Sequence, residues 1–320
     1  MYQPLVFLSA SDEANDLVAL LEYGDDVILK PFSQQVLLAK ILAHKRIRML
    51  YKELQSQNLQ LRAYQKRSEG ELIIAADVFR QLTDRSVQEL PGVSCFASPY
   101  SVFSGDILLM TQGPDHSLYF LVADVTGHGL AAALGSMPTA EHFLALAATG
   151  MPVGQLAREL NRIHVARVPP YILCAALIGR FEPAARVVHY WSGGMPPALV
   201  VSGSGDVRPL FRSMHMAIGA CEDSQFESFE GTLHLDAGDR LVCYTDGVTE
   251  TCNPEGNLWG TNGLVAALNC RPQAPSLLDA VIAALTEFRG SANSANDDVT
   301  LFCLDVDLYL AHVSNRSTLP

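Results

Sequence analysis

Runs of apolar residues separated by turn residues dominate the chain from about residue 85 to residue 306. Eight of these runs predict β-strands, at residues 94–97, 107–110, 118–123, 173–181, 186–190, 198–201, 241–245 and 299–306. Apolar residues at helical spacing predict helices over 129–148, 152–166 and 275–288. Because strands and helices do not alternate regularly, the pattern favours an α+β layered fold over a doubly wound parallel sheet.

A narrow apolar seam marks the segment that precedes this region. Its members follow a three-four spacing that Gln57 interrupts, and they are Ile47, Leu50, Leu54, Leu61 and Tyr64. No proline occurs between Ser33 and Leu90, so one long helix is expected. A polar helix with a single seam is marginal alone, which favours a homodimer through a parallel coiled coil over residues 44–66. The alternative is that the seam packs on the following domain of the same chain, and the stripe in residues 72–82 favours that arrangement locally.

The first 43 residues predict two short parallel strands around one helix. The strands cover residues 4–9 and 27–29, the helix covers 14–23, and Ser33 is placed to cap the long helix. Ser9, which ends the first strand, and Lys30, which follows the second, match the hydroxyl and lysine positions of response-regulator receivers. Residues 1–43 therefore resemble the C-terminal part of a receiver whose phosphoacceptor half is absent. This implies either a truncated receiver or a misassigned start.

Composition and charge exclude several classes of partner. The chain has 320 residues, 49% of them apolar and 18% charged, which is typical of a soluble globular protein. A formal net charge of −12, with one short basic run at 44–48, argues against nucleic acid. No apolar run is long enough for a membrane span and no signal peptide precedes the first strand, so we expect a cytoplasmic protein. The seven cysteines form no Cys-x-x-Cys pair, which favours reduced thiols over zinc or disulfides.

Four acidic sites lie at the ends of predicted strands. Asp124 ends one strand and Asp246 another, both close to glycines, while Asp106 and the pair Asp297-Asp298 precede two others. Carboxylates brought together from four strand ends would repel one another. Hard divalent cations with oxygen ligands are the usual remedy, so this pattern predicts a metal centre.

Five sequence blocks in order resemble the SpoIIE-like branch of the PPM family of metal-dependent serine/threonine protein phosphatases. The blocks are Ser104-Gly105-Asp106, the stretch 124–129, the stretch 191–197, the stretch 238–250 and Asp297-Asp298-Val299-Thr300. The resemblance implies two packed antiparallel sheets flanked by helices, with two divalent cations, Mn²⁺ or Mg²⁺, at one end. Two such cations hold the phosphate and lower the pKa of a water molecule.

The resemblance also implies roles for individual residues. Asp124 would bridge both cations and Asp246 would complete the site, so these two carry the catalysis. Asp297 would bind the first cation and Asp106 the second, with the carbonyl of Val125 as a further ligand. Asp298 is expected to lie just outside the ligand set. His128 is either the general acid or a residue that fixes the turn between its two neighbouring glycines.

This chain departs from the family pattern at two positions, and the role of Glu250 has two interpretations. Met195 stands where relatives usually have a histidine, and Leu109 where many have a second aspartate. Neither change removes an expected ligand, so we expect an effect of Met195 on substrate or loop geometry only. Glu250 is expected to tie down its loop rather than to take part in the chemistry.

Two functions remain open from these residues. The first is a phosphoserine/phosphothreonine phosphatase in bacterial signal transduction, with a phosphorylated anti-sigma-factor antagonist as the implied phosphoprotein substrate. The second is a catalytically silent, RssB-like adaptor that binds a sigma factor or its regulator. The retained aspartates favour the enzyme. The expected organisation is a receiver fragment at 1–43, a coiled-coil connector at 44–82, a phosphatase domain at 83–308 and a C-terminal tail at 309–320.

Overall fold

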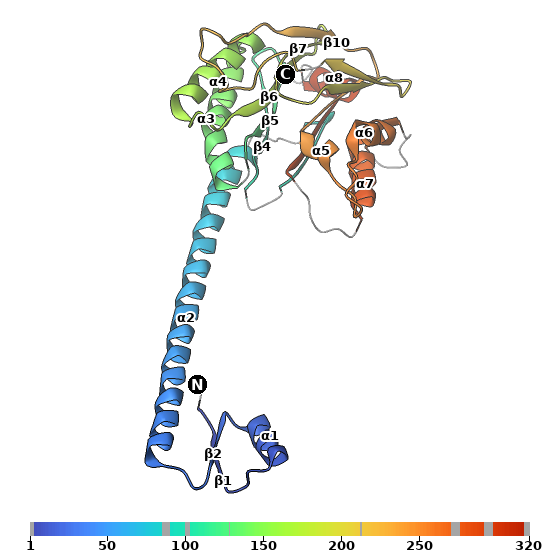
Figure 1. The fold of residues 1–320 in the computed structure, drawn as a ribbon. Helices are drawn as coiled ribbons and strands as arrows, with labels where there is room; N and C mark the ends of the chain where they lie inside the picture. Colours follow the sequence, from blue (N-terminus) through green and yellow to red (C-terminus); the bar gives the residue numbers. More distant parts are fainter. Residues whose placement is uncertain are drawn as a thin grey trace. The chain divides into compact units, whose positions relative to one another are not determined.

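The computed structural model describes residues 3–84, 90–99, 103–127, 129–211, 213–269, 276–290 and 297–316. The chain divides into two compact units, the first covering residues 1–71 and the second residues 72–320 (Figure 1). Within the described ranges, no helix is both long and apolar enough to cross a membrane.

The first unit contains a two-stranded parallel sheet. Strands β1 (Val6–Ser9) and β2 (Asp26–Leu29) pair in register from Val6 opposite Asp26, and α1 (Ala14–Tyr23) connects them. Asp26 accepts hydrogen bonds from Lys40 Nζ at 2.5 Å and lies 3.2 Å from His44 Nε2. Both partners belong to α2 (Gln34–Asp84), so the first turns of this helix are tied to the sheet. The strands and helix agree with the sequence, whereas the receiver assignment stays a prediction.

Helix α2 is a single element of 51 residues. Its seam side chains are solvent-exposed, from 44% for Ile47 to 72% for Tyr64. Near its C-terminal end, Ala76 and Phe79 are instead buried against Phe103 and against Ala133 of α3 (Leu130–Ala147). The expected packing of this second stripe on its own domain is therefore present for Leu72, Ala75, Ala76 and Phe79, while the side chain of Leu82 lies outside the described residues.

The second unit is a sandwich of two five-stranded antiparallel sheets. The first sheet has the order β10-β7-β6-β5-β4 and the second the order β3-β12-β11-β8-β9. The first sheet contains β4 (Asp106–Gln112), β5 (Leu118–Val125), β6 (Cys174–Glu182), β7 (Val187–Gly193) and β10 (Gly231–His234). The second contains β3 (Val93–Ser98), β8 (Ala198–Val201), β9 (Val207–Phe211), β11 (Arg240–Tyr244) and β12 (Val299–Asp305).

Alternation along β5 explains how the layers pack. Leu118, Phe120 and Val122 face the second sheet, where Phe120 stacks on Phe302 with ring centroids 4.5 Å apart. The intervening residues Tyr119 and Leu121 face the helices. Helices α3 (Leu130–Ala147) and α4 (Val153–Arg167) cover this side, and α6 (Gly260–Asn269) and α7 (Leu277–Arg289) cover the second sheet (Figure 1). The expected α+β sandwich of two antiparallel sheets flanked by helices is confirmed.

The C-terminal segment differs from the expected tail. Helix α8 (Val306–Arg316) follows β12 directly, and Tyr309 is fully buried, with its ring edge-on to Phe181 at 5.8 Å. Residues 309–316 are therefore helical and partly packed in the sandwich core. Burial of the large aromatic ring of Tyr309 stabilises the folded protein. Its hydroxyl donates a hydrogen bond to the carbonyl of His116 at 3.3 Å.

Candidate metal centre

The first two carboxylates of the site face each other across neighbouring strands. Asp106 begins β4, Asp124 lies one residue before the end of β5, and the two residues are direct partners in the antiparallel register. Asp106 is buried, and its Oδ2 accepts a hydrogen bond of 2.7 Å from the hydroxyl of Thr245. This bond crosses from the second sheet to the first and holds the Asp106 side chain in place.

The remaining carboxylates come from the second sheet. Strand β11 ends at Tyr244, and α5 (Asp246–Glu250) begins two residues later. β12 pairs antiparallel with β11, so its start at Val299 lies at the same edge, and Asp297 and Asp298 directly precede it. A Cβ at Gly247 would collide with the carbonyl oxygen of Asp298, so only glycine permits this close approach of α5 to the 297–298 backbone.

Asp298 joins the two halves of the site. Its buried carboxylate accepts a hydrogen bond of 2.6 Å from the amide of Gly105, the residue before Asp106. A Cβ built on Gly105 would lie 2.8 Å from the carbonyl oxygens of both Val125 and Gly127. The carbonyl of Val125, which was expected to be a metal ligand, therefore lies beside the Gly105–Asp106 segment.

Burial and repulsion between neighbouring carboxylates raise the pKa of Asp106, Asp124 and Asp246. Burial raises the pKa of Asp106 to about 8, against the lowering effect of hydrogen bonds from Thr300 and Thr245. Burial, followed by the charges of Asp246 and Asp297, raises the pKa of Asp124 to about 7. The pKa of Asp246 is also raised, by burial and by Asp297. The four expected aspartates therefore share one electrostatic environment.

The oxygen donors of the site are of the kind that hard divalent cations prefer, although the carboxylate side chains do not converge on one position. In the described ranges, no group of three His, Cys, Asp or Glu side chains is already arranged to hold a metal ion. The available donors are carboxylate and carbonyl oxygens, which Mn²⁺ and Mg²⁺ prefer. A cation would also relieve the repulsion that raises the pKa of Asp124.

Three further expected residues have different outcomes. His128 lies outside the described residues. Glu250 ends α5 and contributes to the raised pKa of Asp124, so its charge lies close to the site. Met195 is 4% exposed and belongs to the core between the sheets, which means that it fills apolar space. The sequence did not identify Thr245 as a partner of Asp106, because the two residues are far apart along the chain.

Comparisons with known proteins identify relatives of this chain. The family model described as Stage II sporulation protein E (SpoIIE) matches residues 114–307. "Phosphoserine phosphatase RsbU" of Bacillus subtilis (strain 168) is 26% identical over 212 residues, which cover 66% of this chain and 61% of RsbU. "Phosphoserine phosphatase RsbP" of the same organism is 26% identical over 232 residues, covering 70% of this chain and 55% of RsbP. Each alignment thus spans less than two thirds of the relative's own length.

Solved structures show the same fold at low sequence identity. The SiaA-PP2C domain of Pseudomonas aeruginosa superposes with a TM-score of 0.65 at 20% identity, covering 76% of this chain and 98% of that domain. The PP2C phosphatase domain of SpoIIE from Bacillus subtilis, with a fragment of its regulatory domain, gives a TM-score of 0.58 at 17% identity and covers 67% of this chain and 63% of that one. The SpoIIE family model accounts for more than half of the residues, and the chain belongs to the Stage II sporulation protein E (SpoIIE) family.

Proposed function

We propose that this protein is a metal-dependent phosphoserine/phosphothreonine protein phosphatase. The observation that carries the proposal is the convergence of Asp106 and Asp124 from one sheet with Asp246 and Asp297 from the other. Membership of a family whose relatives include two named phosphoserine phosphatases supports the same activity. The transition state of phosphomonoester hydrolysis spreads negative charge over phosphoryl oxygens, so a site of carboxylates alone needs cations to bind it.

Each carboxylate has a proposed role toward two divalent cations, Mn²⁺ or Mg²⁺. Asp124 would be shared by both cations and Asp246 would complete the site, while Asp297 would hold the first cation and Asp106 the second, with the Val125 carbonyl as a further ligand. When bound, such cations neutralise phosphoryl charge and make water a better nucleophile near neutral pH. His128 is proposed either to protonate the leaving hydroxyl group or to fix the Gly127–Gly129 turn.

Two residues beside the carboxylates serve as positioning groups. Thr245 donates its hydroxyl hydrogen to Oδ2 of Asp106, which fixes the orientation of this carboxylate. Asp298 accepts the Gly105 amide and so sets the backbone that begins β4. Groups held in this way need little rearrangement when a cation or a phosphate binds.

The finer biological assignment extends the same proposal. The substrate is a phosphorylated anti-sigma-factor antagonist, and the protein acts in the cytoplasm. Six free cysteines among the described residues fit a reducing compartment. Residues 1–43 are the C-terminal part of a truncated receiver in a response-regulator arrangement, and residues 44–66 form a homodimer. An RssB-like adaptor would have no need to keep all four aspartates, and they are all present.

Turnover of p-nitrophenyl phosphate with and without Mn²⁺ tests the proposed activity. The parent protein is expected to hydrolyse this compound only when Mn²⁺ or Mg²⁺ is present. Asp124→Asn should abolish turnover because it removes the carboxylate shared by both cations. Asp236→Asn is the matched control, since the side chain of Asp236 is 82% exposed and lies outside the site. A well-folded parent with no metal-stimulated turnover would favour the adaptor.

A further inference from the structure

A second candidate site lies in the segment between β9 and β10, apart from the carboxylates. This segment and its neighbours enclose a cavity of about 410 Å³, large enough for one or two amino-acid side chains. The wall includes Met214, His215, Met216, Phe226 and Glu227. None of these residues has a role in the proposed hydrolysis.

Backbone pairing places this segment at the same end of the first sheet as Asp124. Ile218 and Cys174 exchange two backbone hydrogen bonds, of 2.8 and 3.0 Å, and Cys174 is in turn the register partner of Val125. The amide of His215 donates to the carbonyl of Ser192 at the end of β7. A Cβ at Gly193 would collide with the carbonyl oxygen of Met216, so glycine permits the segment to lie this close to the sheet.

The side chains of the segment combine an apolar surface with an unsatisfied polar atom. Met214, Met216 and Phe229 are 53%, 58% and 53% exposed, although each is a large apolar residue. His215 lies stacked on Trp191 with ring centroids 5.2 Å apart, and its side chain is only 4% exposed. Its Nδ1 has no hydrogen-bond partner among the described residues, because the nearest Glu227 carboxylate oxygen is 3.7 Å away.

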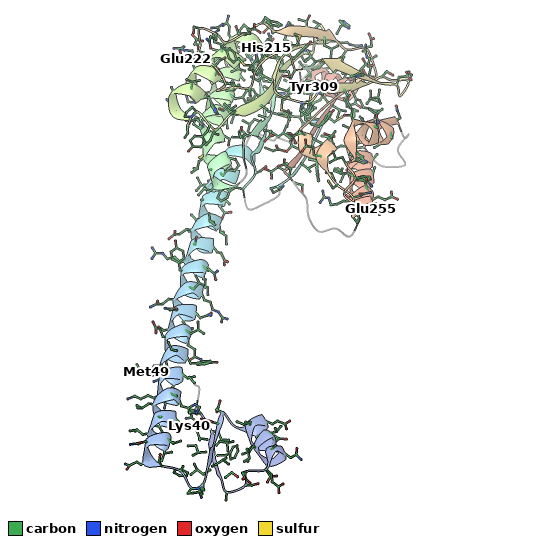
Figure 2. The ribbon with its side chains drawn as sticks, viewed as in Figure 1. Lys40, Met49, His215, Glu222, Glu255 and Tyr309 are labelled. Atoms are coloured by element: carbon green, nitrogen blue, oxygen red, sulfur yellow. The ribbon has the colours of Figure 1, made fainter. Side chains whose placement is uncertain are left out.

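One acidic side chain, that of Glu227, belongs to the wall of the cavity. The side chain of Glu227 is 70% exposed, while Glu222, labelled with His215 in Figure 2, is exposed as well. The whole chain carries a formal charge of −12, so the surrounding potential favours a cationic partner. Methionine side chains adapt to irregular apolar partners, which suits a surface that accepts a side chain from another protein.

We propose that this surface docks a segment of the phosphoprotein substrate in which a large apolar side chain stands beside a lysine or arginine. The apolar side chain enters the cavity between Met214 and Met216, and the cation pairs with Glu227. This inference rests on the proposed phosphatase function and assigns part of its substrate recognition. Two to three strand spacings separate the segment from Asp124, roughly 10–15 Å, which an extended chain covers in about three to five residues.

Phosphoserine peptides of matched length test this docking site. One set carries a Met-Arg pair about four residues before or after the phosphoserine, and the other set carries Ala-Glu at the same positions. The substitutions are Met216→Glu and Glu227→Lys, and the matched control is Leu308→Glu, on α8, which is 58% exposed like Met216. Each protein is measured by kcat/KM for the peptides relative to p-nitrophenyl phosphate, and by anisotropy of the fluorescent peptides in EDTA, where no turnover occurs.

The parent and Leu308→Glu are expected to favour the Met-Arg peptides by about tenfold or more in kcat/KM, because burying one large side chain contributes about that much. Met216→Glu and Glu227→Lys should lose this preference and bind the peptides more weakly in EDTA. Equal values for both peptide sets in a parent that hydrolyses p-nitrophenyl phosphate would overturn the docking site and leave the phosphatase intact. Selective binding in EDTA without any turnover would support the docking site and overturn the phosphatase.

Discussion

At the scale of single residues, Asp298 shows how a side chain outside the ligand set can determine the site. Its carboxylate accepts the buried amide of Gly105, so removing it leaves that donor without its partner. Asp298→Ala is expected to lower the free energy of unfolding by about 1–3 kcal/mol and to reduce phosphatase activity. Asp298→Asn keeps an acceptor oxygen and should remain closer to the parent in urea unfolding. Equal stability of the parent and the alanine variant would show that the bond does not contribute.

His164 provides a pH dependence that is independent of the carboxylates. It is buried between α3 and α4, 3.1 Å from the Thr139 hydroxyl and 2.8 Å from the Ile172 carbonyl oxygen. Burial lowers its pKa in the folded protein below the ordinary value of 6.5. As the pH falls below about 6.5, the unfolded chain therefore binds this proton first, and the free energy of unfolding decreases.

The measurement is urea unfolding of the parent and of His164→Gln between pH 8 and pH 5. The difference in stability between the two proteins should shrink as the pH falls, because only the parent contains a buried imidazole that resists protonation. His234→Gln is the control, since the side chain of His234 is 64% exposed. A difference that stays constant with pH would contradict the assignment.

The sequence located the four aspartates because each stands at the end of a strongly apolar strand. It could not locate the Thr245–Asp106 bond, which joins residues 139 positions apart and leaves no local pattern. Met195 was expected to affect substrate or loop geometry, yet its side chain is buried between the two sheets. The role of a residue that departs from a family pattern depends on packing, and packing follows only from the fold.

At the scale of elements, the apolar runs predicted eight strands, and the structure has all of them. The missed strands, β9 and β10, each lie at the edge of a sheet. An edge strand is less completely covered, so its apolar pattern is weaker, and β9 contains both Arg208 and Pro209. Helix α5 has only five residues, which is too short for helical periodicity to identify.

The exposed apolar seam of helix α2 predicts that the protein forms a dimer. Leu50 and Leu54 lie on the seam and are 59% and 58% exposed, so they are open to packing against a second copy of the helix. Replacing both with glutamate is expected to convert a dimer to a monomer in light scattering, because charge would enter a buried seam. Leu59→Glu is the control, since Leu59 is 68% exposed but lies off the seam. A parent that is already monomeric at micromolar concentration would exclude the coiled coil.

At the scale of the whole second unit, the candidate metal centre joins the two sheets of the sandwich. Asp106 and Asp124 belong to the first sheet, whereas Asp246 and Asp297 flank strands of the second. A cation that binds all of them would connect the sheets as well as prepare the chemistry. Metal binding should therefore appear in the stability of the unit, even before any substrate is known.

Thermal unfolding with and without Mn²⁺ or Mg²⁺ tests this connection. One cation at about 100 times its dissociation constant stabilises the folded state by roughly 2.7 kcal/mol, or on the order of 5–10 °C in Tm for a domain of this size. Asp124→Asn should lose most of this gain, and without metal it should melt no lower than the parent above pH 7, because one repelling charge is gone. Asp236→Asn should respond to metal like the parent. If the Tm of the parent is the same with and without millimolar Mn²⁺ and Mg²⁺, the four aspartates do not form a metal centre, and the adaptor becomes the better explanation of the fold.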